Sequence, residues 1–198
     1  QLMHAQAAGA GPRVRRWQRQ VHERRSRTAG EQPDGRVETQ HGTGLAQSLG
    51  IADDSPDSLR KFDSWYFDFY PYLADYIPFG ELRGQRVLEV GLGYGTVAQR
   101  LAEAGADYHG LDIAAGPVGM VNHRLRLIGH HGQAQQGSIL AAPFADESFD
   151  AVICSSVLYH RWVTDVSGAL QELHRILRPG GLLYLGGWWL FALATVIA

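Results

Sequence analysis

The chain has 198 residues, of which 45% are hydrophobic, and this length supports one well-packed core. Its formal net charge is -2, which argues against nucleic acid or an anionic membrane as the main partner. The single cysteine, Cys154, excludes a disulfide framework and a cysteine zinc site; it fits a reducing compartment, so we expect a cytoplasmic protein.

The first 45 residues differ in composition from the rest of the chain. They hold eight arginines and four acidic residues, with very few large apolar side chains. Such a segment buries too little apolar surface to offset the entropy of ordering it, so we expect residues 1–45 to be disordered. Contact of this arginine-rich segment with RNA or acidic lipid is the alternative to a simple solvated extension.

An aromatic block precedes the first predicted strand. Its members share a short span of the sequence, and they are Trp65, Tyr66, Phe67, Phe69, Tyr70, Tyr72 and Tyr76. We expect residues 46–83 to form cap helices that cover a binding site. Ordinary core packing is the alternative role for the same side chains.

Strands and helices are predicted to alternate after residue 84. Buried apolar runs predict five strands, at residues 86–90, 108–113, 133–139, 149–155 and 182–185. Apolar residues that follow the 3.6-residue period predict three helices, at residues 96–104, 117–128 and 163–177. This alternation predicts an α/β fold with a Rossmann-like, doubly wound and mostly parallel sheet.

A glycine-rich turn joins the first predicted strand to the first predicted helix. Gly91, Gly93 and Gly95 occupy alternate positions in it. Glycine permits unusual backbone angles and lets a ligand approach the main chain closely. Because this turn lies at the carboxyl edge of a doubly wound sheet, it predicts a nucleotide-like cofactor across the three glycines.

Asp112 ends the second predicted strand and therefore comes to the same edge of the sheet. Its carboxylate can accept hydrogen bonds from both hydroxyls of a ribose. The alternative interpretation is that Asp112 caps the helix that follows it.

Two classes of cofactor compete for the glycine turn. A dinucleotide site needs a third glycine three residues after Gly93, and Thr96 stands there instead. Glu89, two residues before the first glycine, would repel a pyrophosphate but suits a ligand with an ammonium and a sulfonium. The sequence therefore favours S-adenosylmethionine, and an NAD(P)-dependent oxidoreductase is the alternative.

Four motifs together resemble the class I S-adenosylmethionine-dependent methyltransferases of the methyltransferase 11 type. In chain order they are VLEVGLGYGT, GLDI, GSILAAPFADESFDAVICSSVLYH and LHRILRPGGLLYLG. The resemblance implies a methyltransferase domain over residues 84–198 that transfers a methyl group from S-adenosylmethionine to a small-molecule acceptor. A cofactor-binding fragment without catalysis is a further hypothesis.

The resemblance also assigns roles to individual residues of the glycine turn and the second strand. It places the methionine part of the cofactor against Glu89 and the backbone of the three glycines. It gives the ribose hydroxyls to Asp112 and packs Ile113 on the adenine ring.

The segment after the third predicted strand departs from the family. Relatives usually carry Gly-Asp there, with the acid bound to the adenine amino group, whereas this chain has Gly137 followed by Ser138. Ser138 can accept that hydrogen bond but is neutral and shorter, and the Ile139 backbone is the substitute that we expect. Ser155, at the end of the fourth strand, is expected to line the methyl-transfer pocket.

Tyr159 and His160 follow the fourth strand and are expected to face the methyl group. His160 is a candidate general base for an oxygen or nitrogen nucleophile. A histidine that only lines the substrate wall or caps the loop is the alternative, because in-line methyl transfer depends largely on positioning.

Two further segments receive structural interpretations. Adjacent histidines such as His130 and His131 rarely ligate one ion, so no metal site is expected. Residues 182–198 form an apolar run, but its first part is the fifth strand, which leaves too few residues to cross a membrane. Related enzymes continue with a helix and two antiparallel strands, so we expect a C-terminally truncated domain whose fifth strand is an exposed edge.

Overall fold

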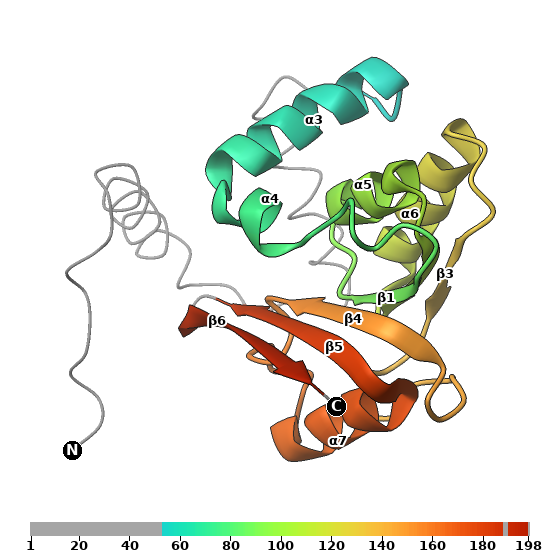
Figure 1. Ribbon diagram of the computed structural model, residues 1–198. Helices are drawn as coiled ribbons and strands as arrows, with labels where there is room; N and C mark the ends of the chain where they lie inside the picture. Colours follow the sequence, from blue (N-terminus) through green and yellow to red (C-terminus); the bar gives the residue numbers. More distant parts are fainter. Residues whose placement is uncertain (1–52, 188–189, 198) are drawn as a thin grey trace. The chain divides into compact units, whose positions relative to one another are not determined.

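The computed structural model describes residues 53–187 and the backbone of residues 190–197 (Figure 1). The segment predicted to be disordered, residues 1–45, lies outside the described residues, as do the first positions of the predicted cap. The described elements are α3 (Pro56–Phe69), α4 (Tyr72–Tyr76), β1 (Arg86–Val90), α5 (Thr96–Ala104), β2 (Asp107–Asp112), α6 (Ala115–Leu127), β3 (Gln133–Gln136), β4 (Phe149–Ser155), α7 (Val166–Ile176), β5 (Leu177–Gly187) and β6 (Leu190–Ile197).

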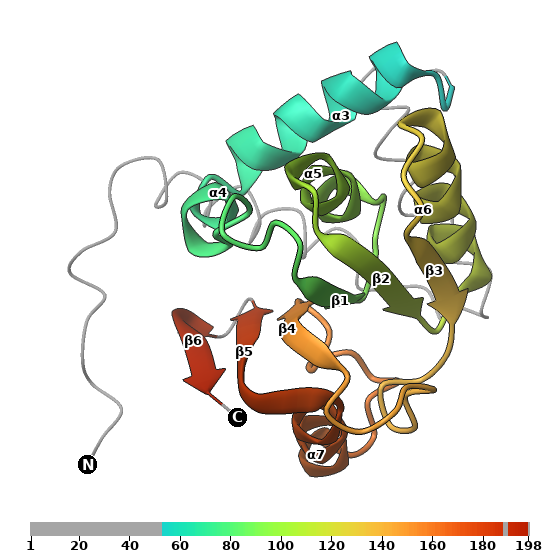
Figure 2. The same cartoon turned by 45° about the vertical axis from the view of Figure 1, so that its right-hand side comes forward.

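The described strands form one sheet in the order β3-β2-β1-β4-β5-β6. Neighbouring strands from β3 to β5 pair in parallel, which confirms the Rossmann-like, mostly parallel sheet. Figures 1 and 2 show α5 and α6 on one face of the sheet and α7 on the other. The chain returns from β3 to the far side of β1 to form β4, so the strand order reverses between β1 and β4. Ligands of such sheets bind at the carboxyl ends of the strands beside this reversal.

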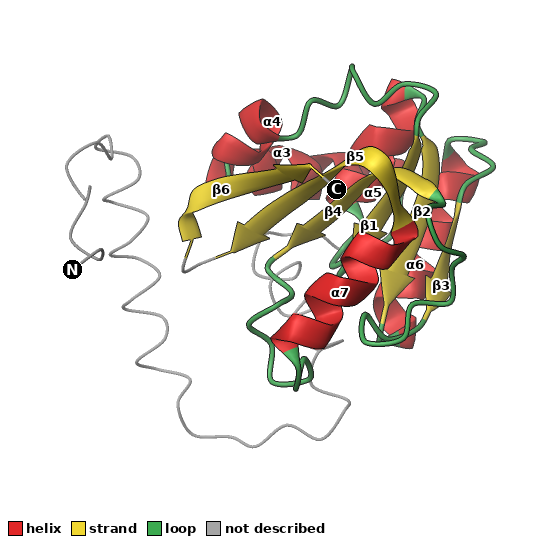
Figure 3. Ribbon diagram, turned by 60° about the horizontal axis from the view of Figure 1, so that its bottom comes forward, coloured by secondary structure: helices red, strands yellow, loops and turns green. Residues whose placement is uncertain are grey.

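The predicted exposed edge at the fifth strand is wrong. β6 runs antiparallel beside β5, with Leu182 opposite Ile197 and Gly187 opposite Leu190 (Figure 3). The ladder between the two strands occupies backbone groups of β5 that were expected to be free to recruit another chain. The prediction treated residues 190–197 as an apolar extension and overlooked that a run of this length can turn back and pair.

The core has one apolar layer on each face of the sheet. Val87 belongs to the layer beneath α5 and α6, and the next residue, Leu88, belongs to the layer beneath α7. Consecutive side chains of a strand point to opposite faces, so a strand between two helical layers is apolar at nearly every position, and Glu89 of β1 is an exception. α7 packs through Ala169, Leu173 and Ile176, which are all buried and follow the helical period.

A side-chain cap explains why α7 begins later than the periodicity predicted. Asp165 has an extended backbone, and its carboxylate accepts a hydrogen bond from the Gly168 amide at 2.9 Å. This is the usual N-cap arrangement, and it starts the helix at Val166. The apolar pattern at the preceding residues therefore belongs to the loop.

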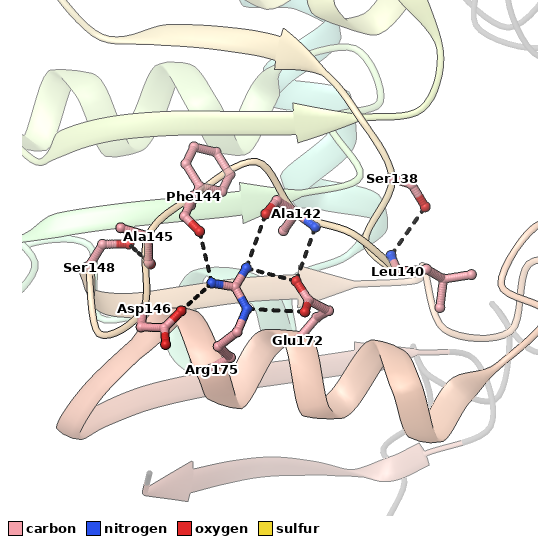
Figure 4. Close-up of polar contacts among 9 residues, drawn as sticks. All are labelled: Ser138, Leu140, Ala142, Phe144, Ala145, Asp146, Ser148, Glu172 and Arg175. Atoms are coloured by element: carbon pink, nitrogen blue, oxygen red, sulfur yellow. Dashed lines mark hydrogen bonds and ion pairs between the residues drawn. The ribbon is translucent and has the colours of Figure 1, made fainter.

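An arginine of α7 holds the loop between β3 and β4 (Figure 4). Arg175 donates to both carboxylate oxygens of Glu172, at 3.1 and 2.8 Å, and to Asp146 at 2.6 Å. It also donates to the backbone carbonyls of Phe144, at 2.9 Å, and Ala142, at 3.1 Å. All five guanidinium N–H groups therefore have an acceptor. These contacts fix the segment that contains Phe144 and Asp146 at the turn into β4.

We expect Arg175→Lys to destabilise the fold by about 2 kcal/mol, because an ammonium has fewer donors and cannot serve two carbonyls and two carboxylates. Urea unfolding followed by circular dichroism measures the change. His174→Ala is the matched control, since His174 is the exposed neighbour of Arg175 on the same helix. Equal stability of the lysine variant and this control would show that the arginine contacts do not hold the loop.

Candidate cofactor-binding site

The glycine turn lies where the sequence predicted it, between the end of β1 and the start of α5. Gly91, Gly93 and Gly95 have φ angles of 81°, 51° and 80°, in the left-handed region that favours glycine. A Cβ at Gly91 would overlap the side chain of Val157, and a Cβ at Gly95 would come within 2.9 Å of Arg124 Cδ. These two glycines are therefore required by packing.

Gly93 differs from the other two glycines of the turn. A Cβ at this position would meet no atom within 4 Å, so the backbone faces open space. That space belongs to a cleft lined by predicted site residues, namely Glu89, Gly91, Gly93 and Ser155. Tyr66 of α3 also lines it, so the cap contributes a wall. The turn thus presents bare backbone to a cleft, as a closely bound ligand requires.

Glu89 lies at the end of β1 and is only 5% exposed. The hydroxyl of Tyr108, on the adjacent strand β2, donates a hydrogen bond to its carboxylate at 2.8 Å. Burial raises the pKa of Glu89 to about 8, and the nearby charge of Asp112 adds to this, whereas the hydrogen bond from Tyr108 and the charge of Arg124 oppose it. A cation in the cleft would favour the ionised carboxylate, because it would supply the missing counter-charge.

Asp112 supports the glycine turn directly. One carboxylate oxygen accepts a hydrogen bond from the Leu92 amide at 2.8 Å, and the other accepts from the Ala114 amide at 2.9 Å. Ala114 is the N-cap residue of α6, so this bond closes a local turn just before the helix and does not cap the first turn of α6. Binding of a ribose by Asp112 stays a prediction. Asp112→Ala would remove both backbone contacts, so loss of binding in that variant alone does not demonstrate a ribose contact.

Of the three residues predicted to contact adenine, Ile113 is exposed, whereas Ile139 and Ser138 make contacts within the fold. Ile113 is 50% exposed beside Asp112, which leaves apolar surface for a flat ring. Ile139 is buried in the core layer under α7. The Ser138 hydroxyl accepts a hydrogen bond from the Leu140 amide at 3.1 Å (Figure 4). A bond from Ser138 or the Ile139 backbone to adenine stays a prediction.

Tyr159 and His160 lie on the loop between β4 and α7. Their rings are stacked, with centroids 5.2 Å apart and planes inclined by 18°. The His160 amide donates to the Val157 carbonyl at 2.9 Å, which closes a turn of the backbone. Neither residue lines the cleft at the glycine turn, whereas Ser155 does. The structure therefore places the two candidate catalytic residues on the exposed loop after β4, outside the lining of this cleft.

Comparison with known proteins bears on what this cleft binds. Residues 88–185 match the family model described as a methyltransferase domain, and they include both the glycine turn and the Rossmann-like strands around it. This part of the chain belongs to the class I S-adenosylmethionine-dependent methyltransferases. The resemblance found in the four sequence motifs is confirmed.

The methyltransferase domain has curated and solved relatives. The biotin biosynthesis bifunctional protein BioHC of Cellvibrio japonicus is 35% identical over 144 residues, which cover 71% of this chain and 26% of that protein. The fatty-acid O-methyltransferase of Mycolicibacterium smegmatis is 36% identical over 137 residues, which cover 67% of this chain and 46% of that enzyme. The YcgJ protein of Bacillus subtilis has a TM-score of 0.53 at 29% identity, over 59% of this chain and 50% of its own. The chain thus spans about half or less of the length of these proteins.

The cleft of the methyltransferase domain suits the cationic methionine end of S-adenosylmethionine. It contains the buried acid Glu89, and among the residues that line it none is lysine or arginine. A pyrophosphate would lack a cationic partner there, whereas an ammonium or sulfonium would gain an anionic one. The open backbone at Gly93 provides the close approach that a bound cofactor needs.

Sequence reasoning missed a polar cluster behind the glycine turn of the methyltransferase domain. The carboxylate of Asp63, on α3, accepts a hydrogen bond from the Thr96 hydroxyl at 2.7 Å. It also forms an ion pair with Arg124, whose Nη1 lies 2.9 Å away. Arg124 is fully buried and also donates to Gln99 at 2.7 Å. A signal for it existed in the sequence, because Arg124 lies three residues after Val121 and four before Ile128, which places a charge on the apolar face of its helix.

His130, the first of the paired histidines, makes local contacts in the described structure. One ring nitrogen of His130 lies 3.1 Å from the Ala106 carbonyl, and the other accepts from the Gly132 amide at 2.9 Å. Among residues 53–187, no group of three or more histidine, cysteine, aspartate or glutamate side chains is placed to hold a metal ion. No helix in the same range is both long enough and apolar enough to cross a membrane.

Proposed function

We propose that this protein transfers a methyl group from S-adenosylmethionine to a small-molecule acceptor. The observation that carries the proposal is the buried carboxyl of Glu89 beside the open glycine turn, in a cleft without a basic lining residue. The family of residues 88–185 supports the cofactor, and the fatty-acid O-methyltransferase relative supports a small acceptor. An NAD(P)-dependent oxidoreductase is disfavoured, because its pyrophosphate would face Glu89.

In the proposed binding mode, three groups of residues at the edge of the sheet contact different parts of the cofactor. Glu89 and the backbone of Gly91 and Gly93 would hold the methionine end, with Gly95 shaping the turn. Asp112 would bind the ribose hydroxyls, and the exposed Ile113 would pack on adenine. When bound, the cofactor supplies a methyl group that is already activated by positive sulfur. The chain's own part is then to orient the two reactants and exclude water.

The acceptor side of the proposed site lies toward α3 and the β4–α7 loop. Tyr66 and Ser155 line the cleft from these two directions. His160 is proposed to take a proton from an oxygen or nitrogen nucleophile, with its ring oriented by the stacked ring of Tyr159. We propose that α3 and α4, within the predicted cap of residues 46–83, cover the site.

We place this activity in the cytoplasm, with a small molecule and no nucleic acid or membrane as the partner. The buried, unpaired thiol of Cys154 supports a reducing compartment.

Transfer of a labelled methyl group tests the proposed reaction. The full chain is incubated with methyl-labelled S-adenosylmethionine and a panel of fatty acids, phenols and amines, and the products are separated and counted. We expect label in at least one class, and slower transfer by His160→Gln at unchanged cofactor affinity. Saturable cofactor binding without transfer to any class would instead support the cofactor-binding fragment without catalysis.

A further inference from the structure

Two arginines of the domain differ in how well their hydrogen-bonding groups are satisfied. Arg175 uses all five N–H groups, two on Glu172 of its own helix and three on the loop before β4 (Figure 4). Arg124 is fully buried, yet its Nε and Nη2 atoms have no hydrogen-bond partner, and its two bonds both come from Nη1. Its guanidinium also lies over the Tyr94 ring, with Cζ 5.5 Å from the ring centroid. A buried guanidinium with two unsatisfied nitrogens still pays a desolvation cost that its ion pair recovers only in part. The contact between Arg124 and Asp63 therefore adds little net stability to the fold.

Asp63 joins α3 to the elements that support the glycine turn. One carboxylate oxygen binds the hydroxyl of Thr96, the first residue of α5, and the other binds Arg124 of α6. Arg124 packs against Gly95, which has no side chain to obstruct it. An aromatic contact accompanies these hydrogen bonds: the rings of Phe62, on α3, and Tyr94, in the glycine turn, have centroids 4.4 Å apart. α3 is thus attached to the turn through Phe62, and to the two helices behind the turn through Asp63.

The same helix closes the cleft. Tyr66 lies three residues after Asp63 on α3, and it lines the cleft opposite Glu89 and the glycines. Figure 2 shows α3 running across the helical layer that contains α5 and α6. When Asp63 is bound to Thr96 and Arg124, the Tyr66 side of the cleft is held in place. Movement of α3 would widen the cleft on that side.

We propose that Asp63 is a positioning residue that latches α3 as a lid over the cofactor cleft. The proposal rests on the proposed function, because the ligand beneath the lid is S-adenosylmethionine. Opening the lid lets water reach Nε and Nη2 of Arg124, and this hydration offsets much of the ion pair that is lost. The open and closed states are therefore close in free energy, so bound cofactor favours the closed lid and the closed lid holds the cofactor.

Amide hydrogen exchange with and without S-adenosylhomocysteine tests the latch, with affinities from titration calorimetry on the same samples. In the wild type we expect the ligand to slow exchange across α3. In Asp63→Asn we expect faster exchange of α3, unchanged exchange of β1 and β4, and affinity reduced about tenfold, as typical coupling free energies predict. Asp68→Asn is the matched control, since it removes the same charge from an exposed position of the same helix.

The outcomes separate the latch from the proposed function. If the wild type binds the ligand and Asp63→Asn matches the Asp68→Asn control in affinity and in exchange of α3, the latch is overturned. If the wild type does not bind the ligand at all, the proposed cofactor is overturned, and the lid role fails with it. Should Asp63→Asn not fold, Asp63→Leu combined with Arg124→Met removes both charges together. We expect that double variant to fold but to lose ligand-dependent protection of α3, and retained protection would overturn the latch.

Discussion

Glu89→Gln is expected to abolish measurable binding of S-adenosylmethionine while making the fold more stable at alkaline pH. The amide keeps an acceptor for the Tyr108 hydroxyl, so the local hydrogen bond survives. It cannot supply the negative charge that a sulfonium or ammonium requires in a buried cleft. It also removes a carboxyl that the fold must otherwise bury. Binding and stability should therefore move in opposite directions.

The pH dependence of this effect has a definite sign. The pKa of Glu89 is raised from 4.5 to about 8, so between these values the folded protein keeps a proton that the unfolded chain has released. The unfolding free energy of the wild type should then fall as pH rises through this window, and the glutamine variant should not share that loss. Urea unfolding at several pH values measures the difference, which should grow from near zero below the window to a few kcal/mol, roughly, above it.

Glu103→Gln is the matched control for this experiment, because Glu103 is exposed on α5. Its stability should follow the wild type at every pH, and its cofactor binding should be unchanged. A stability difference between Glu89→Gln and the wild type that does not vary with pH would contradict the buried, protonated carboxyl. If Glu89→Gln bound the cofactor with the affinity of the wild type, Glu89 would have no role in binding it.

Gly93→Val is expected to weaken cofactor binding by at least about 100-fold, because the new side chain would fill space that the ligand needs. Gly129→Val is a close control. Both glycines have positive φ angles, 51° and 67°, and a Cβ at either would meet no atom within 4 Å. Both variants should therefore pay a similar backbone strain, about 1–2 kcal/mol or somewhat more.

Only the ligand should distinguish the two glycine variants. Gly129 follows α6, outside the cleft, so its variant should lose stability and keep cofactor affinity. Titration calorimetry and thermal unfolding of both proteins measure the two quantities separately. Equal affinities in the two variants would mean that no ligand lies against the backbone at Gly93.

Local sequence signals predicted the centre of the fold well. The bounds of β1, α5 and β4 match the predictions residue for residue, because largely apolar runs and flanking glycines mark where these elements begin and end. The start of α7 was misplaced because the cap at Asp165 overrides the apolar periodicity. β6 was missed because pairing with β5 is a contact between strands, and no short window of sequence records it.

The candidate site was predictable where one motif contains it. Glu89, Gly91 and Gly93 share a strand and the turn after it, and Ser155 ends the strand beside them, so sheet topology alone brings them together. Asp63 and Arg124 are 61 residues apart and meet only because α3 docks on α5 and α6. Sequence spacing carries no information about that docking. The only sign of this contact in the sequence was Arg124, a charged residue on the otherwise apolar face of its predicted helix.

Titration calorimetry of the full chain with S-adenosylmethionine, S-adenosylhomocysteine and NAD tests most directly whether the cleft at the glycine turn is a methyltransferase cofactor site. We expect saturable binding of the first two at one site per chain and no response to NAD. Saturable binding of NAD, with no response to S-adenosylmethionine or S-adenosylhomocysteine, would contradict the assignment of this cleft.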